Sequence, residues 1–261
     1  MVEYLGVSPQ FLSSMLGEPE YWAPGDFFLH DQHGSNKSLG KPTVPLVCFN
    51  LLTMRLTEFF CQHPRWQMHA KNTPFSVYMK HDFGEGTTSY IVMADRSHPR
   101  AQCIKRRIST CFSTASTADT QDPFMIHCLI VEETLVDAKS VVTPLRLELY
   151  NQLDQVDECI PSHDRGKADL ELMTVKLHYI SRMIDPLIAN ADMTGMIMRH
   201  MQASHDRYSD SLPVPGISNA TTKTSDSIRY LLESAESQKR WLVSYKSRKD
   251  ATMNLVSLLY E

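Results

Sequence analysis

The sequence predicts an α+β protein in which a sheet-containing first half is followed by three long helices that form a stalk. In the first half, short β-branched or aromatic runs alternate with Pro, Gly and Asp clusters, as strands and turns do. In the second half, apolar residues recur every three or four positions, which is typical of one face of an α-helix. We therefore predict a sheet-containing domain over residues 1–131 and a long-helix region over residues 132–261.

The first half begins with a short predicted helix over residues 9–16, with Ser8 as its N-cap and Pro9 at the first helical position. Turn residues over 81–86 join two predicted strands as a hairpin whose loop is longer than two residues. Residues 109–122 are rich in Ser, Thr, Ala and Asp without an apolar period, and are predicted to form a loop. The predicted strands are residues 45–52, 75–80, 89–94 and 124–131.

Pro144 and Pro186 interrupt the helical patterns of the second half, and each is expected to bend its helix because proline lacks the N–H donor. Residues 205–225 contain two prolines and a glycine among polar residues and are predicted to form a loop. The predicted helices span about 132–160, 168–204 and 225–261.

Each long helix carries an apolar stripe that should be buried. On the third helix, Leu231, Leu242, Val256 and Leu259 are expected to pack against the first two helices or against neighbouring subunits. This pattern reaches residue 261 without a C-cap signal, so we expect the natural polypeptide to continue, toward a membrane segment. The stripe of the second helix is Leu170, Met173, Leu177, Ile180, Ile184, Leu187, Ala191, Thr194, Met198 and Met201.

The composition excludes several classes of protein. With 26 Lys and Arg against 30 Asp and Glu in 261 residues, the formal charge is -4, and the chain lacks the basic surplus of a nucleic-acid-binding protein. The longest apolar run, residues 124–131, is interrupted by His127 and is too short to cross a bilayer. Six cysteines without a CxxC pair, and no signal-peptide pattern, favour free thiols in the cytosol.

Known catalytic and nucleotide-binding motifs do not occur in the sequence. Neither GxGxxG nor GxxxxGK[ST] is found, and a GxSxG elbow is absent. The tripeptide Asp82-Phe83-Gly84 lacks the other kinase motifs and is interpreted as a turn. We therefore predict that the protein is not an enzyme and assign no catalytic or cofactor-binding residues.

The histidines do not form a recognisable metal-binding motif. The segment His30-Asp31-Gln32-His33 is interpreted as a polar loop, because the HExxH pattern is absent. His200 and His205 lie about 140° apart on a helix and are expected to be solvated, together with Asp206. The single histidines His63, His69 and His81 are expected to be surface or hydrogen-bonded side chains.

Two groups of side chains on the long helices have alternative interpretations. The methionines at 183, 193, 196, 198 and 201 could form an adaptable binding surface, but their helical spacing favours core or helix–helix packing. The basic residues of the last helix are interpreted as a solvated face or, more sharply, as a stripe facing phosphate or a membrane surface. They are Lys239, Arg240, Lys246, Arg248 and Lys249.

Three segments carry a resemblance to a known family. Residues 238–256, QKRWLVSYKSRKDATMNLV, resemble the helix that leads into the membrane in fungal CorA-like magnesium transporters. Residues 4–12 resemble the opening segment of those proteins, and residues 124–131 resemble the piece before their long helices. The family's Gly-Met-Asn signature is absent, and Gly195-Met196-Ile197 lacks the Asn.

The resemblance implies a cytosolic αβα layered domain with a mixed sheet, followed by a helical stalk. It also implies a regulatory or assembly role in a homo-oligomer, a pentamer in the full-length family, with Mg²⁺ as a regulatory ion at subunit interfaces. The fragment itself would be soluble, at the cytoplasmic face of a membrane, and attached only through a segment outside this chain. No acidic position matches the family residue by residue, so the metal ligands stay unassigned.

Two alternatives from other classes remain. One is a stand-alone helical interaction module whose stripes bind a partner helix. The other, ranked third, is a hydrolase or metalloenzyme, which stoichiometric zinc or iron would favour.

Overall fold

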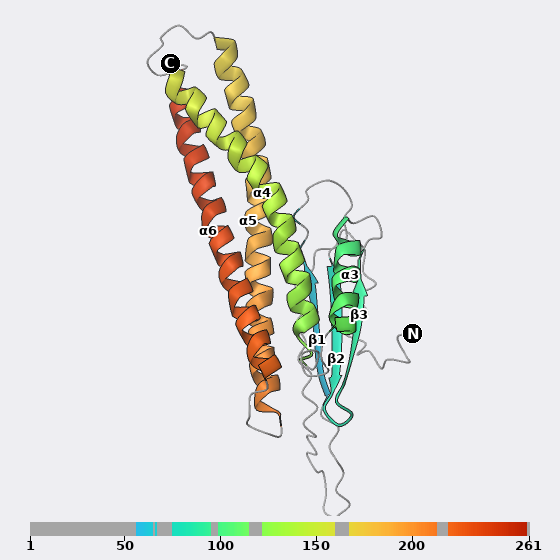
Figure 1. Cartoon of the computed structure of the whole chain (residues 1–261). Coiled ribbons are helices and arrows are strands. Elements are labelled where there is room, and N and C mark those ends of the chain that lie inside the picture. Colours follow the sequence, from blue (N-terminus) through green and yellow to red (C-terminus); the bar gives the residue numbers. More distant parts are fainter. Residues whose placement is uncertain are drawn as a thin grey trace, which may run out of the picture.

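The computed structural model describes residues 56–64, 66, 75–94, 99–114, 122–159, 167–212 and 219–259. It confirms the predicted fold class, since an antiparallel three-stranded sheet is followed by long helices that form a stalk (Figure 1). Five predicted features fall on residues or side chains that the structure does not describe: the helix at 9–16, the strand at 45–52, the segment 30–33, His69 and the packing of the Leu259 side chain.

The sheet has the strand order β1-β2-β3. Its strands are β1 (Leu56–His63), β2 (Phe75–Asp82) and β3 (Thr87–Met93), and both pairings among them are antiparallel, whereas the resemblance implies a mixed sheet. The predicted hairpin between β2 and β3 is confirmed, with a loop over residues 83–86. Asp82 Oδ1 accepts hydrogen bonds from the backbone N–H groups of Gly84 and Glu85, so Asp82-Phe83-Gly84 is the turn that was predicted.

The helices are α3 (Pro99–Thr114), α4 (Met125–Cys159), α5 (Lys167–Asp210) and α6 (Asn219–Leu259). Figure 1 shows α4, α5 and α6 side by side as the stalk, with α3 against the sheet. Both α4 and α5 contact β1, so β1 is the strand next to the stalk. At 1.5 Å per residue, the 44 residues of α5 extend over about 65 Å.

Several predicted element boundaries are wrong. Residues 124–131 were predicted as a strand, but they form a turn and the first two turns of α4, so the long-helix region begins at Met125 rather than at 132. Helix α5 continues to Asp210, and α6 begins at Asn219 rather than at 225. The loop predicted over 109–122 is helical as far as Thr114, within α3. Neither β1 nor α3 was predicted.

The interior is divided between two clusters of buried side chains. One joins the sheet to α3, to the start of α4 and to the neighbouring ends of α5 and α6. The other lies between the three stalk helices and includes Trp66. All ten core positions predicted for the second helix, from Leu170 to Met201, are buried, as are Leu231, Leu242 and Val256 of α6. Met198 and Met201 are buried and Met193 packs against the same cluster, which agrees with the interpretation of the methionines as core.

Helices α4 and α5 continue through Pro144 and Pro186. In Figure 1, α4 changes direction about midway along its length, as expected for a proline inside a helix. Among the described residues, no helix combines the length and the apolar character needed to cross a membrane.

Candidate functional site

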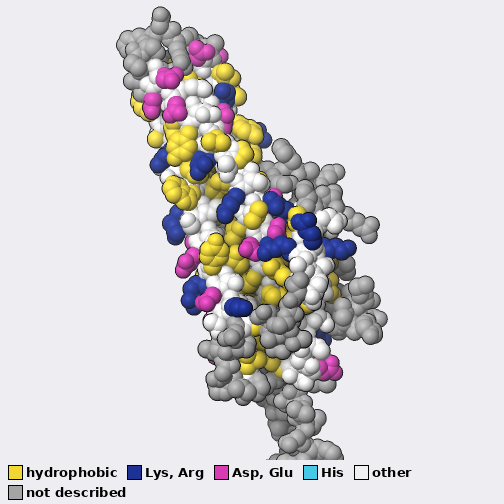
Figure 2. Space-filling model, in the orientation of Figure 1, with side chains coloured by type: hydrophobic (Ala, Val, Ile, Leu, Met, Phe, Trp, Pro, Cys, Tyr) yellow, Lys and Arg dark blue, Asp and Glu magenta, His cyan; other side chains and the backbone are white. Residues whose placement is uncertain are grey.

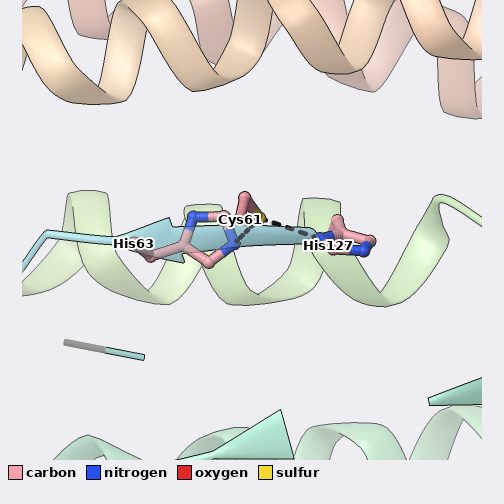
Figure 3. A group of neighbouring side chains, drawn as sticks. All are labelled: Cys61, His63 and His127. Atoms are coloured by element: carbon pink, nitrogen blue, oxygen red, sulfur yellow. Dashed lines mark hydrogen bonds between the residues drawn. The ribbon is translucent and has the colours of Figure 1, made fainter. Parts of the chain in front are cut away.

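Three metal-ligating side chains meet where β1 packs against α4. Cys61 and His63 are two residues apart on β1, so their side chains lie on the same face of the strand. His127 lies in the first turn of α4 and reaches the same point from the helix. Figure 3 shows the three side chains pointing toward one another between the strand and the helix. We call this group the Cys61–His63–His127 cluster.

The sulfur atom is the centre of the cluster. Cys61 Sγ lies 3.1 Å from His63 Nε2 and 3.3 Å from His127 Nδ1. One ligand atom from each residue can be chosen so that all three lie within 4.8 Å of one another. The two remaining ring nitrogens, His63 Nδ1 and His127 Nε2, have no hydrogen-bond partner among the described residues. The arrangement therefore leaves polar atoms unsatisfied in the interior, which is unusual in folded proteins.

The surroundings of the cluster are apolar. All three side chains are fully buried. The ring of Phe59 packs edge-on against the ring of His127, with 4.9 Å between the ring centroids. Burial lowers the pKa of His63 to about 3 and holds the pKa of His127 well below its usual range. Burial raises the pKa of the Cys61 thiol. In the absence of a metal, the cluster therefore consists of a thiol and two neutral imidazoles.

A second buried polar group fixes the start of α4. Asp122 Oδ1 accepts a hydrogen bond from the N–H of Phe124, and Asp122 Oδ2 lies 2.9 Å from His205 Nε2 on α5. Both side chains are almost completely buried. Tyr208, one turn after His205, has its pKa raised to about 12 by burial and by the charge of Asp122. The pair connects Asp122, just before α4, to His205, near the end of α5. We therefore interpret it as a structural contact that fixes the start of α4 against α5.

A groove runs along the stalk between α4 and α6. It has a volume of about 900 Å³ and is lined mainly by apolar and aromatic side chains, with the charged residues Glu132, Lys139 and Arg146 among them. Four of its large hydrophobic side chains are 40–65% exposed: Val136, Leu147, Tyr230 and Trp241. Figure 2 shows hydrophobic side chains gathered along this part of the stalk, with Lys and Arg beside them. We call this surface the α4–α6 groove.

A separate row of apolar side chains is exposed on α5. Leu172, Val175 and Tyr179 are 55–64% exposed, and their spacing of three and four residues places them on one face of the helix. Asp169 and Glu171 are exposed beside this row. We call Leu172, Val175 and Tyr179 the α5 stripe.

The basic residues of α6 are largely engaged with other side chains. Lys239 and Lys246 form ion pairs of 2.6 Å with Asp192 and Asp185 of α5. Lys249 is 7% exposed and contacts Ser181 and Asp250. Much of the predicted basic stripe is thus neutralised by α5 or by its own helix.

The resemblance implies magnesium, an ion that binds oxygen ligands. Among the described residues, no three carboxylates lie close enough together to share one ion. Several carboxylates of the stalk helices are instead paired with Lys or Arg. Glu133 of α4 pairs with Arg107 of α3, and Asp185 of α5 pairs with Lys246 of α6. The described part of a single chain therefore does not fit a magnesium site, and we assign no magnesium ligand.

The structure revises several of the sequence-based interpretations. His205 is not solvated, because it is buried. His63 is buried and hydrogen-bonded, with its Nε2 3.1 Å from Cys61 Sγ, which is one of the two outcomes expected for it. His81 was expected to be hydrogen-bonded if not at the surface, and its Nδ1 lies 2.9 Å from Thr88 Oγ1. The four cysteines whose side chains the structure describes, Cys61, Cys103, Cys111 and Cys128, are free, as predicted. The metal-ligating cluster itself was missed, although Cys61-Gln62-His63 offered a local signal.

Comparison with known proteins adds no relative: the chain matches no family model, and no curated protein matches its sequence.

Proposed function

We propose that the chain is the cytosolic, non-catalytic part of a CorA-like divalent-cation transporter, with a role in regulation or assembly. The observation that carries this proposal is the stalk. Its three helices bury their stripes against one another, yet they leave large apolar side chains exposed on two surfaces. Exposed apolar surface of this kind is typical of proteins that contact further chains.

The position of the resemblance in the fold supports the same proposal. Residues 238–256, which resemble the helix leading into the membrane in CorA-like proteins, lie entirely within α6. At 41 residues, α6 extends over about 60 Å, and it packs against both α4 and α5. A continuous helix of this length is suited to connect a sheet-containing domain with a distant membrane segment.

The two exposed surfaces suggest how copies of the chain would assemble. The α4–α6 groove is concave, whereas the α5 stripe lies on the surface of a single helix, so a contact between them joins unlike surfaces. Contacts between unlike surfaces generate closed rings when the rotation closes. We therefore propose that the α5 stripe of one copy occupies the α4–α6 groove of the next, within a pentamer.

Charge favours a second copy as the occupant of the groove. The groove is lined by two basic residues and one acidic residue, Lys139, Arg146 and Glu132. Beside the α5 stripe lie the exposed Asp169 and Glu171 and the half-buried Lys176, so the groove carries a net positive charge and the stripe a net negative one. Opposite charges at the edges of the two surfaces would orient the contact and disfavour other registers. A partner helix from a different protein is the alternative occupant, and the experiment below distinguishes the two.

Light scattering over a range of protein concentrations, with and without millimolar Mg²⁺, tests the proposal. We expect weak self-association of this chain that Mg²⁺ strengthens, because the membrane helices of such transporters supply much of the pentamer contact. A tight dimer that does not respond to Mg²⁺ would favour the interaction module. Independently, two hydrophobic spans in the natural reading frame after codon 261 would support the proposal, and a catalytic domain there would overturn it.

A further inference from the structure

We propose that Cys61, His63 and His127 bind one soft d¹⁰ metal ion, and that the charge balance of the site favours Cu⁺ over Zn²⁺. This site is separate from the proposed transport role, because its ligands are nitrogen and sulfur and it lies inside one copy of the chain. The argument rests on the geometry of the cluster, its burial and its charge.

The spacing of the three ligand atoms suits a metal ion. With metal–sulfur and metal–nitrogen bonds of about 2.3 and 2.0–2.1 Å, neighbouring ligand atoms in a trigonal or tetrahedral site lie about 3.3–3.7 Å apart. The two distances from Cys61 Sγ are 3.1 and 3.3 Å, and all three ligand atoms lie within 4.8 Å. Small rotations of the two rings would therefore suffice to enclose an ion.

The type of ligand selects the class of ion. Thiolate and imidazole are soft or borderline ligands that favour Cu⁺ and Zn²⁺, whereas Mg²⁺ and Ca²⁺ require oxygen. Burial keeps both imidazoles neutral, which is the form that donates a lone pair to a metal. On binding, the Cys61 S–H bond breaks, the sulfur bonds to the metal and one proton leaves for solvent, without a change in oxidation state.

A structural role alone does not account well for this cluster. A thiol and two imidazoles occupy a point where Phe59 and Phe124 supply the neighbouring core. The two outer ring nitrogens have no partner among the described residues, and they are not the nitrogens that face the sulfur, so it is the three convergent ligand atoms in an apolar interior that favour an ion. A bound ion would use the lone pairs that face the sulfur.

The net charge of the site distinguishes the two candidate ions. One thiolate and two neutral imidazoles balance Cu⁺ completely, but they leave a charge of +1 with Zn²⁺. An unbalanced charge is costly in an apolar interior. Within the described regions, no Asp or Glu joins the cluster as a fourth ligand. Glu58 lies on β1 three residues from Cys61, at a position that alternates to the other face of the strand.

Metal binding would also link the two parts of the fold. Two of the ligands belong to the sheet and the third belongs to the first stalk helix. An ion held by all three binds only the folded chain, so it should raise the melting temperature. We expect a rise of about 5–11 °C when the free metal concentration is 100 times the dissociation constant.

The experiment uses the full chain after all metal has been removed. The protein is titrated with Cu⁺ under anaerobic, reducing conditions, in competition with a chromophoric Cu⁺ chelator. A separate titration uses Zn²⁺. We expect one equivalent of Cu⁺ to bind, and binding to weaken at least 100-fold in Cys61→Ser and His127→Gln. Cys128→Ser is the matched control, because Cys128 is a buried free thiol next to His127 in sequence but outside the cluster. It should bind Cu⁺ as the unaltered chain does.

X-ray absorption at the copper edge gives a readout that does not depend on whether a variant folds. The expected first shell of the unaltered chain is one sulfur and two imidazole nitrogens. A shell of sulfur alone, equal loss of binding in Cys128→Ser, or no stoichiometric binding would overturn the site. Tighter binding of Zn²⁺ than of Cu⁺ would overturn the preference derived from charge.

Discussion

Leu242 is the sharpest single-residue probe of the stalk. It lies in the middle of α6, away from the helix ends, and none of its side chain is exposed. We expect Leu242→Ala to lower the free energy of unfolding by about 2–5 kcal/mol, because truncation leaves a cavity between packed helices. Urea denaturation at equilibrium measures this. A loss below about 0.5 kcal/mol would mean that this face is not closed in solution.

The adjacent residue provides the control for Leu242. Trp241 is 53% exposed and lines the α4–α6 groove rather than the core. Truncation to Ala should therefore lower the free energy of unfolding of the single chain by only about 1 kcal/mol, mainly through the lost ring contact with Tyr245. The loss of unfolding free energy on truncation to Ala should thus differ severalfold between these two neighbouring residues, because burial and not residue size determines the cost.

The buried histidines make the stability of the metal-free protein depend on pH. His63 and His127 stay neutral in the folded chain, with the pKa of His63 lowered to about 3, whereas both protonate near pH 6.5 when the chain unfolds. Below pH 6.5 the unfolded state therefore binds more protons, and stability falls as the pH falls. The slope is about 1.4 kcal/mol per pH unit for each histidine.

Urea denaturation of chelator-treated protein at pH 7.5 and pH 5.0 tests this slope. The two histidines together should lower the free energy of unfolding by about 4 kcal/mol between pH 7.5 and 5.0. Replacing both by Leu should flatten the dependence, and replacing the exposed His200 by Ala should leave it unchanged. An unchanged slope in the double variant would show that other groups cause the pH dependence.

At the scale of elements, Asp122 determines where α4 begins. Its carboxylate accepts the N–H of Phe124 and pairs with His205, both in the interior. We expect Asp122→Ala to cost about 3–5 kcal/mol, because it removes one member of a buried pair. Asp122→Asn keeps an acceptor for Phe124 and a partner for a neutral imidazole, so it should cost about 1–2 kcal/mol. Equal losses in the two variants, measured by urea denaturation, would contradict this role.

The long helices could be predicted from sequence because their burial is periodic. Every apolar position predicted to face the core on the second helix, from Leu170 to Met201, is buried, since one face of α5 meets its neighbours along most of its length. Residues 124–131 were misassigned because both sides of this segment are largely buried, and a continuous apolar run does not distinguish a helix from a strand. Strand β1 was missed because Thr57, Glu58 and Gln62 are buried, so its polar positions do not mark a solvent face.

At the scale of the whole molecule, only part of the candidate metal site could be found in the sequence. Cys61 and His63 are two residues apart on one strand and therefore share a face, and that spacing is visible in the local sequence. His127 is 64 residues from His63 along the chain and reaches the cluster only because α4 packs on β1. Tertiary packing of this kind leaves no local pattern, so a single histidine in an apolar run gave no reason to suspect a ligand.

Assembly through unlike surfaces makes a prediction that assembly through a single surface does not. If the α5 stripe of one copy packs into the α4–α6 groove of the next, Trp241→Glu damages only the groove and Val175→Glu damages only the stripe. Each variant alone should fail to self-associate, because every contact needs one intact groove and one intact stripe. Both substitutions are at exposed positions, so the single chains should remain folded.

Mixing the two variants tests the arrangement. The intact stripe of Trp241→Glu should fit the intact groove of Val175→Glu, and the damaged surfaces should then block further growth. We expect a one-to-one complex by sedimentation velocity, at concentrations where neither variant associates alone. Lys223→Glu is the control, because Lys223 lies on an exposed part of α6 away from both surfaces, and this variant should self-associate as the unaltered chain does. If two grooves instead faced each other across a twofold axis, Val175→Glu would still dimerise and Trp241→Glu would join no complex, because a symmetric contact uses the same surface on both copies.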